Sequence, residues 1–126
     1  LKRILKKSGL LVLTVPAFQF LWGELDERSH HLKRYKIGEL IEILQQCGFK
    51  IQKIIYFNYL FFLPIAIIRL FQRSFLGTKN YWGVDPVVKN NFINNILTFI
   101  FGLDVVSALK LSPPFGVSIL VLATKD

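Results

Sequence analysis

The first half of the chain carries the hydrophobic pattern of a strand, a helix and a second strand. Residues 10–15 form an apolar run between Gly9 and Pro16, which predicts a short strand buried on both faces, as in a parallel sheet. Apolar residues then recur at helical spacing across 37–47, and Gly48 follows where a helix commonly ends. Residues 49–56 again have the pattern of a strand. A helix between two strands is typical of a doubly wound α/β sheet.

The second half of the chain is dominated by apolar residues. Residues 54–68 contain no charge, but Pro64 interrupts them, and a membrane span needs roughly 20 apolar residues. We therefore predict that this run completes the preceding strand and continues as a helix against the core or in the membrane interface, without crossing it. A further helix with a wide apolar face is predicted over 92–111, and a final apolar strand over 116–124.

Composition favours a membrane surface over nucleic acid as a partner. The 126 residues are 52% hydrophobic and have a net charge of +8, from 16 Lys and Arg against 8 Asp and Glu. A basic excess attracts phosphate and anionic lipid alike. The aromatic residues, however, lie mostly in uncharged runs, whereas RNA-binding surfaces typically interleave aromatic and basic side chains. This pattern disfavours nucleic acid.

Cysteine and methionine usage adds two expectations. Cys47 is the only cysteine, which excludes an internal disulfide and a cysteine metal cluster and fits a reducing cytoplasm; no metal site is predicted. The sequence contains no Met and opens on residues that look like the end of a helix. We therefore expect a fragment of a longer protein, long enough for one domain but not for two.

Residues 5–16 are similar to the turn and fifth strand of class I, S-adenosylmethionine-dependent methyltransferases. That family commonly has Leu-Lys-Pro-Gly-Gly before an apolar strand, and Lys7-Ser8-Gly9 stands here in place of Pro-Gly-Gly. The match continues in features that resemble one bacterial and archaeal subgroup: Phe20-Leu21-Trp22, Asp26, His30-His31, Arg34-Tyr35, Leu40, Leu44 and Cys47-Gly48-Phe49. The resemblance covers residues 1 to about 60 and the final strand, while the residues between them match only in being hydrophobic.

The resemblance implies a Rossmann-like, seven-stranded sheet whose last strand is antiparallel. Residues 1–126 would be the C-terminal portion of a single methyltransferase domain, with strands five to seven and a helical hydrophobic insertion at about 57–115. The Gly-rich first loop and the acidic residue after the second strand, which hold S-adenosylmethionine in the family, have no counterpart here. We therefore expect the main cofactor site to lie outside this sequence and the isolated chain to be inactive.

Candidate site residues follow the first strand, because ligands of open α/β sheets bind beyond the carboxyl ends of the strands. Pro16, at that end, is the candidate cofactor contact. His31 is the candidate catalytic base, and its alternative role is a hydrogen bond that fixes the loop. The candidate substrate contacts are Trp22, Asp26, Arg34 and Tyr35. Their alternatives are an Asp–Arg pair that holds the loop together and aromatic rings that only pack.

The leading interpretation is an enzyme that transfers a methyl group from S-adenosylmethionine to a small-molecule or lipid-like acceptor. The alternative is a non-catalytic, membrane-associated module with a degenerate methyltransferase fold. The apolar insertion suits both, either as cover for the sheet or as a hydrophobic surface for a lipid-like acceptor or an anionic membrane. We expect a cytoplasmic protein, peripheral at the membrane.

Overall fold

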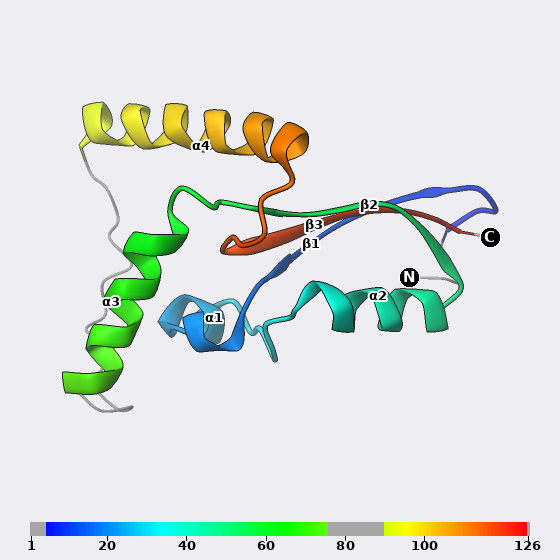
Figure 1. Ribbon diagram of the computed structural model, residues 1–126, viewed down its shortest axis with the longest axis horizontal. Helices are drawn as coiled ribbons and strands as arrows, with labels where there is room; N and C mark the ends of the chain where they lie inside the picture. Colours follow the sequence, from blue (N-terminus) through cyan, green and yellow to red (C-terminus); the bar gives the residue numbers. More distant parts are fainter. Residues whose placement is uncertain (1–4, 76–89, 126) are drawn as a thin grey trace.

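The computed structural model describes residues 5–75 and 90–125, and its centre is a three-stranded sheet (Figure 1). The strands β1 (Leu10–Pro16), β2 (Phe49–Phe57) and β3 (Ser118–Lys125) lie in the order β1-β3-β2. β3 pairs antiparallel with both neighbours, which confirms the prediction of an antiparallel last strand. β1 and β2 therefore run in the same direction without pairing with each other. The fold is mixed α/β.

Helical segments connect β1 to β2. The short helix η1 (Gln19–Leu21) and α1 (Glu24–Arg28) lie in the loop after β1, and α2 (Ile37–Gln46) packs against one face of the sheet. Gly48 ends α2 with a φ of 74°, the left-handed conformation that glycine adopts without strain. The buried core lies between α2 and the sheet and contains Leu11, Ala17, Leu40, Leu44, Phe49, Tyr56, Ile119, Val121 and Ala123.

β1 is not buried on both faces, and this part of the sequence prediction is wrong. Leu11 faces the core, whereas Leu10 and Val12, on the other side of the strand, are 60% and 58% exposed. The reason is that α2 covers one face of the sheet, while on the opposite face the described helices reach only the part near β2. The neighbour of β1 is the antiparallel last strand, β3.

The uncharged run at 54–68 is divided between β2 and α3 (Phe62–Phe75). Pro64 lies in the first turn of α3, where its missing N–H costs no helical hydrogen bond. Aromatic rings hold this end of the helix: Phe62 lies 5.7 Å from Phe18 and 5.0 Å from Phe115, measured between ring centroids. Among the described side chains beyond the first two turns of α3, Leu70, Phe71 and Ser74 are exposed, whereas Arg69 is partly buried.

α4 (Asn91–Leu111) is a long apolar helix with little of its surface buried. Asn90 caps it by accepting hydrogen bonds from the N–H groups of Phe92 and Ile93. By length and composition alone α4 is able to cross a membrane, and 11% of its apolar window is buried. The pattern of 92–111 predicts the helix correctly, but our sequence analysis did not single it out as a segment of membrane length.

The second half of α4 is anchored to the end of β2. The fully buried Asp104 accepts hydrogen bonds from the backbone N–H groups of Asn58, at 2.6 Å, and Leu60, at 2.8 Å. Lys53, on β2, donates to the carbonyl of Leu109 near the C-terminal end of α4. These contacts fix the helix against the sheet. The part of the predicted insertion at 76–89 lies outside the described residues.

Candidate functional site

The loop between β1 and α2 is closed at its base by backbone hydrogen bonds. Ala17 and Tyr35 form an isolated parallel bridge, in which Phe18 N donates to Tyr35 O at 3.0 Å and Tyr35 N donates to Pro16 O at 2.9 Å. Ala17 N also donates to the carbonyl of Val117 at 2.9 Å. The loop that carries the predicted substrate residues is therefore attached to the carboxyl end of β1 and to the chain entering β3.

Asp26 is the centre of a buried hydrogen-bond network inside this loop. Its carboxylate accepts from Nε and Nη2 of Arg34, over distances of 2.8 to 3.1 Å, and from the N–H of Gly23 at 2.9 Å. Arg34 Nη1 donates to the carbonyl of Ala17 at 3.1 Å. The Asp26 and Arg34 side chains are 2% and 9% exposed. Their contacts favour the alternative in which the pair holds the loop together; a substrate contact by either stays a prediction.

The network keeps Asp26 ionised. Burial by itself raises the pKa of this carboxyl group, because the charged form is poorly solvated inside the loop. Hydrogen bonds from Arg34 and from the Gly23 N–H, the charge of Arg34 and the contact with His31 outweigh burial, so the pKa lies below its ordinary value of 3.8. At neutral pH the Asp26 carboxylate is therefore only an acceptor of hydrogen bonds.

His31 lies beside Asp26 and lines a cavity at the carboxyl end of β1. Its Nδ1 is 3.3 Å from Oδ1 of Asp26, and its side chain is 43% exposed. The cavity measures about 200 Å³ and is lined by Thr14, Val15, Pro16, His31, Phe57 and Ser118. Because the carboxylate only accepts, we assign the ring hydrogen to Nδ1, which leaves Nε2 able to accept a proton. The structure thus brings together two predicted residues, His31 and Pro16.

The other predicted residues do not line this cavity. The indole N–H of Trp22 lies 3.4 Å from a carboxylate oxygen of Glu27, and Tyr35 packs against the core between α2 and the sheet. Lys33 Nζ lies 5.5 Å from the centre of the Tyr35 ring. These contacts favour a packing role for Tyr35, and a contact of either aromatic ring with an acceptor stays a prediction. His30 is exposed on the surface of the loop.

Four residues that line the cavity were not predicted from the sequence: Thr14, Val15, Phe57 and Ser118. Phe57 ends β2 and pairs with Ser118, which in turn pairs with Pro16 at the end of β1. The strand patterns identify these positions as strand ends, but only the order β1-β3-β2 places them side by side. No local signal in the sequence specifies that order.

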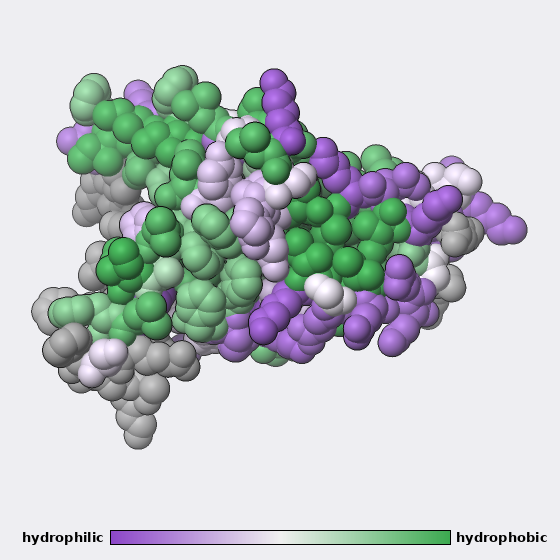
Figure 2. All heavy atoms as spheres, in the orientation of Figure 1, coloured by the Kyte–Doolittle hydropathy of each residue, from purple (hydrophilic) through white to green (hydrophobic). Residues whose placement is uncertain are grey.

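The exposed apolar surface of α3 and α4 is a second candidate for function. Figure 2 shows hydrophobic side chains gathered over α4, at the upper left, and over the neighbouring part of the molecule. The exposed side chains include Leu63, Ile67 and Ile68 on α3 and Phe92, Phe99 and Val106 on α4. Single exposed apolar residues are ordinary, but many of them on two helices make this surface a candidate for an interaction site.

Neither a metal-binding group nor a comparison with known proteins identifies the family of this chain. Within residues 5–75 and 90–125, no group of three or more His, Cys, Asp or Glu side chains is placed to hold a metal ion. The sequence matches no protein-family model and no curated protein, and the fold matches no solved structure. The mixed α/β sheet with its antiparallel last strand is observed; the methyltransferase family remains a prediction from the sequence resemblance.

Proposed function

We propose that this chain is the acceptor side of an S-adenosylmethionine-dependent methyltransferase that acts on a small-molecule or lipid-like acceptor. The observation that carries this proposal is the cavity at the carboxyl end of β1, where the ionised Asp26 holds the His31 ring. A strand's carboxyl end is where open α/β sheets bind their ligands. An imidazole fixed by a carboxylate is an arrangement suited to taking a proton from an acceptor.

The described residues do not fit the whole cofactor. The His31 cavity of about 200 Å³ is smaller than the roughly 300 Å³ at which small-molecule sites begin. This volume has room only for the reacting group of an acceptor, so we assign only the acceptor side to this chain, with Pro16 as its predicted contact with the cofactor. When bound, S-adenosylmethionine would supply a methyl group already activated by its sulfonium, so the chain's own contribution is to position the acceptor and remove its proton.

His31 acts as the general base in this proposal. An acceptor hydroxyl or amine in the cavity would pass its proton to Nε2 of His31 while its oxygen or nitrogen lone pair attacks the methyl carbon. The carbon–sulfur bond would break at the same time, and its electron pair would leave with the sulfur of neutral S-adenosylhomocysteine. The negative charge of Asp26 would stabilise the imidazolium that results, and its contact with Nδ1 would keep the ring oriented. Asp26 is thus a positioning residue. Arg34 acts indirectly, because it keeps Asp26 ionised.

In the full-length protein, we expect His31→Gln to lower kcat by about 10²- to 10⁴-fold, because glutamine cannot take up the proton. The KM for the acceptor should change little. His30→Gln is the matched control, since His30 is the exposed neighbour outside the cavity and should keep the wild-type kcat. The measurement is release of S-adenosylhomocysteine with a total lipid extract or a pool of small hydroxylated and amine acceptors.

Two results would count against this function. A wild-type kcat in His31→Gln would remove His31 from the reaction while leaving methyl transfer itself in place. Absence of S-adenosylhomocysteine release from the wild-type full-length protein, with every acceptor pool, would contradict the proposed activity.

A non-catalytic, membrane-associated module is the second candidate function, and α4 is the observation that favours it. The helix has membrane length, and its apolar residues are largely exposed. In this interpretation the protein is cytoplasmic and peripheral, with α3 and α4 in the membrane interface. The exposed Lys50 and Lys110 would then add attraction to anionic head groups.

Flotation with lipid vesicles tests the membrane contact. We expect the full-length protein to co-float with phosphatidylserine-containing vesicles, and the double change of Phe92→Glu and Phe99→Glu to abolish most of this binding. These side chains are 73% and 67% exposed, so the change places charge on the apolar surface without disturbing the core. Asn91→Glu with Asn95→Glu adds the same charge at polar positions and should float as wild type does. Failure of the wild-type protein to co-float with these vesicles would exclude the function of a membrane-associated module.

A further inference from the structure

Two hydroxyl groups line the His31 cavity beside the imidazole ring, those of Thr14 and Ser118. Thr14 is the only polar residue of β1. Ser118 begins β3 and is followed by five apolar residues. The two strands are otherwise apolar around the cavity, so their hydroxyl side chains gather where His31 lies.

The Ser118 side chain points to the face of the sheet opposite α2. The next residue, Ile119, lies in the core between α2 and the sheet, and successive side chains of a strand point to opposite faces. Pro16 and Phe57 are the pairing partners of Ser118 on the two neighbouring strands, so the three side chains share one face. All three residues line the His31 cavity. The Ser118 hydroxyl is therefore directed to the cavity.

The backbone holds Ser118 in place from both sides. β3 is the central strand, so Ser118 pairs with β1 and with β2. Just before it, the carbonyl of Val117 accepts from the N–H of Ala17 at 2.9 Å. Gly116 passes so close to β2 that a Cβ at this position would overlap the carbonyl oxygen of Phe57. A hydroxyl on such a rigid segment has a fixed position, which suits a binding group.

The Ser118 hydroxyl has no hydrogen-bond partner within residues 5–75 and 90–125, and its side chain is partly buried. It is therefore able to donate to a molecule in the cavity. No Lys, Arg, Asp or Glu lines the cavity. Asp26, behind the His31 ring, is 2% exposed and already accepts from Arg34 and from the Gly23 N–H. The cavity thus has no carboxylate that could pair with an ammonium group.

A hydroxyl group of the acceptor matches the polar groups of this cavity. Its hydrogen can be donated to Nε2 of His31, and one lone pair of its oxygen can accept from Ser118. The second lone pair remains for the methyl group. An aliphatic amine, by contrast, is an ammonium ion at neutral pH, because its ordinary pKa is about 10. An ammonium ion has no lone pair for the methyl group, and its burial without a carboxylate is unfavourable.

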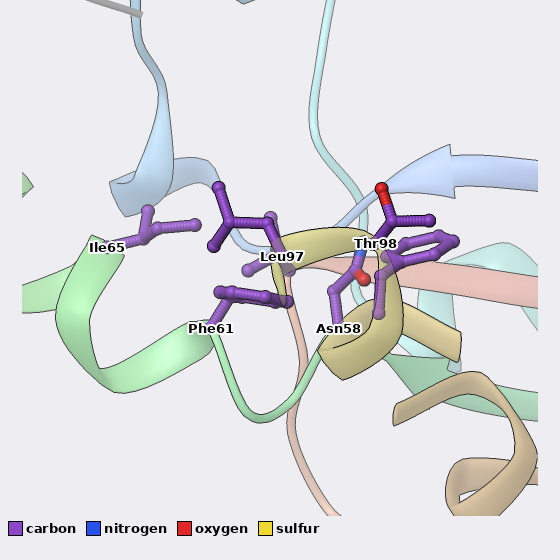
Figure 3. Close-up of a pocket in the computed structure, with 7 residues that line it drawn as sticks. Asn58, Phe61, Ile65, Leu97 and Thr98 are labelled. Carbon is purple, nitrogen blue, oxygen red and sulfur yellow. The ribbon is translucent and has the colours of Figure 1, made fainter. Parts of the chain in front are cut away.

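The larger, apolar cavity between α3 and α4 lacks this set of groups (Figure 3). It measures about 450 Å³ and is lined by Asn58, Phe61, Ile65, Leu97, Thr98, Phe101 and Val117. The hydroxyl of Thr98 already donates to the carbonyl of Asn94 at 2.8 Å, and Oδ1 of Asn58 is buried away from solvent. Recognition of an acceptor hydroxyl therefore belongs to the His31 cavity.

We propose that the acceptor is an uncharged alcohol or phenol and that Ser118 holds its oxygen beside His31. Its identity as the methyl acceptor rests on the proposed function, whereas the binding of a hydroxyl group does not. In the transfer, the hydroxyl proton moves to Nε2 of His31 and the oxygen forms the new bond to the methyl carbon. The electron pair of the broken carbon–sulfur bond leaves with neutral S-adenosylhomocysteine. Ser118 keeps its own proton and only donates a hydrogen bond.

The test compares three probes that share one carbon skeleton: benzyl alcohol, benzylamine and benzyl methyl ether. The reacting group can enter the cavity while the ring stays at its mouth. Binding to the full-length protein without S-adenosylmethionine is followed through the His31 ring resonance in nuclear magnetic resonance spectra, which is identified by its loss in His31→Gln. We expect the alcohol to bind at least about fivefold more tightly than the charged amine and than the ether, which cannot donate to His31.

Ser118→Ala should weaken the binding of benzyl alcohol about fivefold, because one hydrogen bond is lost. The variant should unfold at the same urea concentration as the wild type, since the hydroxyl has no partner in the described chain. Thr98→Val is the matched control: it removes a hydroxyl outside the His31 cavity and should bind the alcohol as the wild type does. Equal affinity of Ser118→Ala and wild type for the alcohol would overturn the proposal, as would equal affinity of the wild type for the alcohol and the amine. Absence of a saturable shift of the His31 resonance with the alcohol would do the same.

The atom that receives the methyl group is tested separately. The full-length protein is given S-adenosylmethionine with a ¹³C-labelled methyl group and a pool of hydroxylated and amine acceptors, and the product is identified by its ¹³C resonance. A label on oxygen supports the proposal, and a label on nitrogen or carbon overturns it. Absence of transfer to every acceptor would contradict the proposed function, while alcohol binding that depends on Ser118 would still support the hydroxyl site.

Discussion

Replacement of Asp26 by asparagine is expected to lower the free energy of unfolding by about 3–5 kcal/mol, the largest effect of any substitution considered for this chain. Asparagine keeps the size of the side chain but removes the charge. Arg34, whose side chain is 9% exposed, would then hold a buried positive charge without its partner. The amide nitrogen would also face N–H donors, since Arg34 and Gly23 both donate to Asp26. Urea unfolding followed by circular dichroism measures the loss.

Glu42→Gln is the matched control for this change. It removes the same charge from an exposed position on α2 and should alter the free energy of unfolding by less than about 0.5 kcal/mol. If Asp26→Asn and Glu42→Gln unfold at the same urea concentration, the buried pair does not stabilise the loop, and the role of Asp26 in holding His31 also loses its basis.

The part of the stability that depends on ionisation of Asp26 should be lost in acid. Its pKa is lower in the folded protein than the ordinary value of 3.8, so the folded state favours the ionised form. The stabilisation that comes from ionised Asp26 is complete above pH 3.8. It is lost as the pH falls through the lower pKa that Asp26 has in the folded state. The difference in the free energy of unfolding between wild type and Asp26→Asn should therefore be largest at neutral pH and become smaller as the pH falls below 3.8. A difference that stays constant below pH 3.8 would show that ionisation of Asp26 is not its source.

Asp104→Ala is expected to lower the free energy of unfolding by about 3 kcal/mol, because hydrogen bonds to a charged group contribute about 1.5–3 kcal/mol each. The change leaves the N–H groups of Asn58 and Leu60 without their acceptor beneath α4. These two amides should exchange with solvent faster than the other amides of the turn. Urea unfolding and hydrogen exchange of the full chain provide the two measurements.

Ser107→Ala is the control on the same helix. The Ser107 hydroxyl lies 2.8 Å from the hydroxyl of Tyr59 and 3.0 Å from the backbone carbonyl oxygen of Asp104, and both partners are uncharged. Its loss should lower the free energy of unfolding by about 1 kcal/mol. Equal losses in Asp104→Ala and Ser107→Ala, with no local increase in exchange, would contradict the anchoring role of Asp104.

The sequence by itself was sufficient to place the three strands and the longer helices, but not the short helices η1 and α1. The predicted strands at 10–15, 49–56 and 116–124 correspond to β1, β2 and β3, and the helices at 37–47 and 92–111 correspond to α2 and α4. These predictions succeed because periodicity, caps and glycine stops are local properties of the chain. The end of β1, after which the candidate site residues follow, was also readable from Pro16.

Tertiary structure decided which residues meet. The order β1-β3-β2 brings Phe57 and Ser118 to the end of β1, and it leaves Leu10 and Val12 on an open face that the apolar pattern predicted to be buried. Likewise, Asp104 looks like an isolated charge in an apolar helix until the turn after β2 supplies its two N–H partners. Such contacts join residues far apart in the chain, and the energy of each depends on the burial of both partners, which no local pattern records.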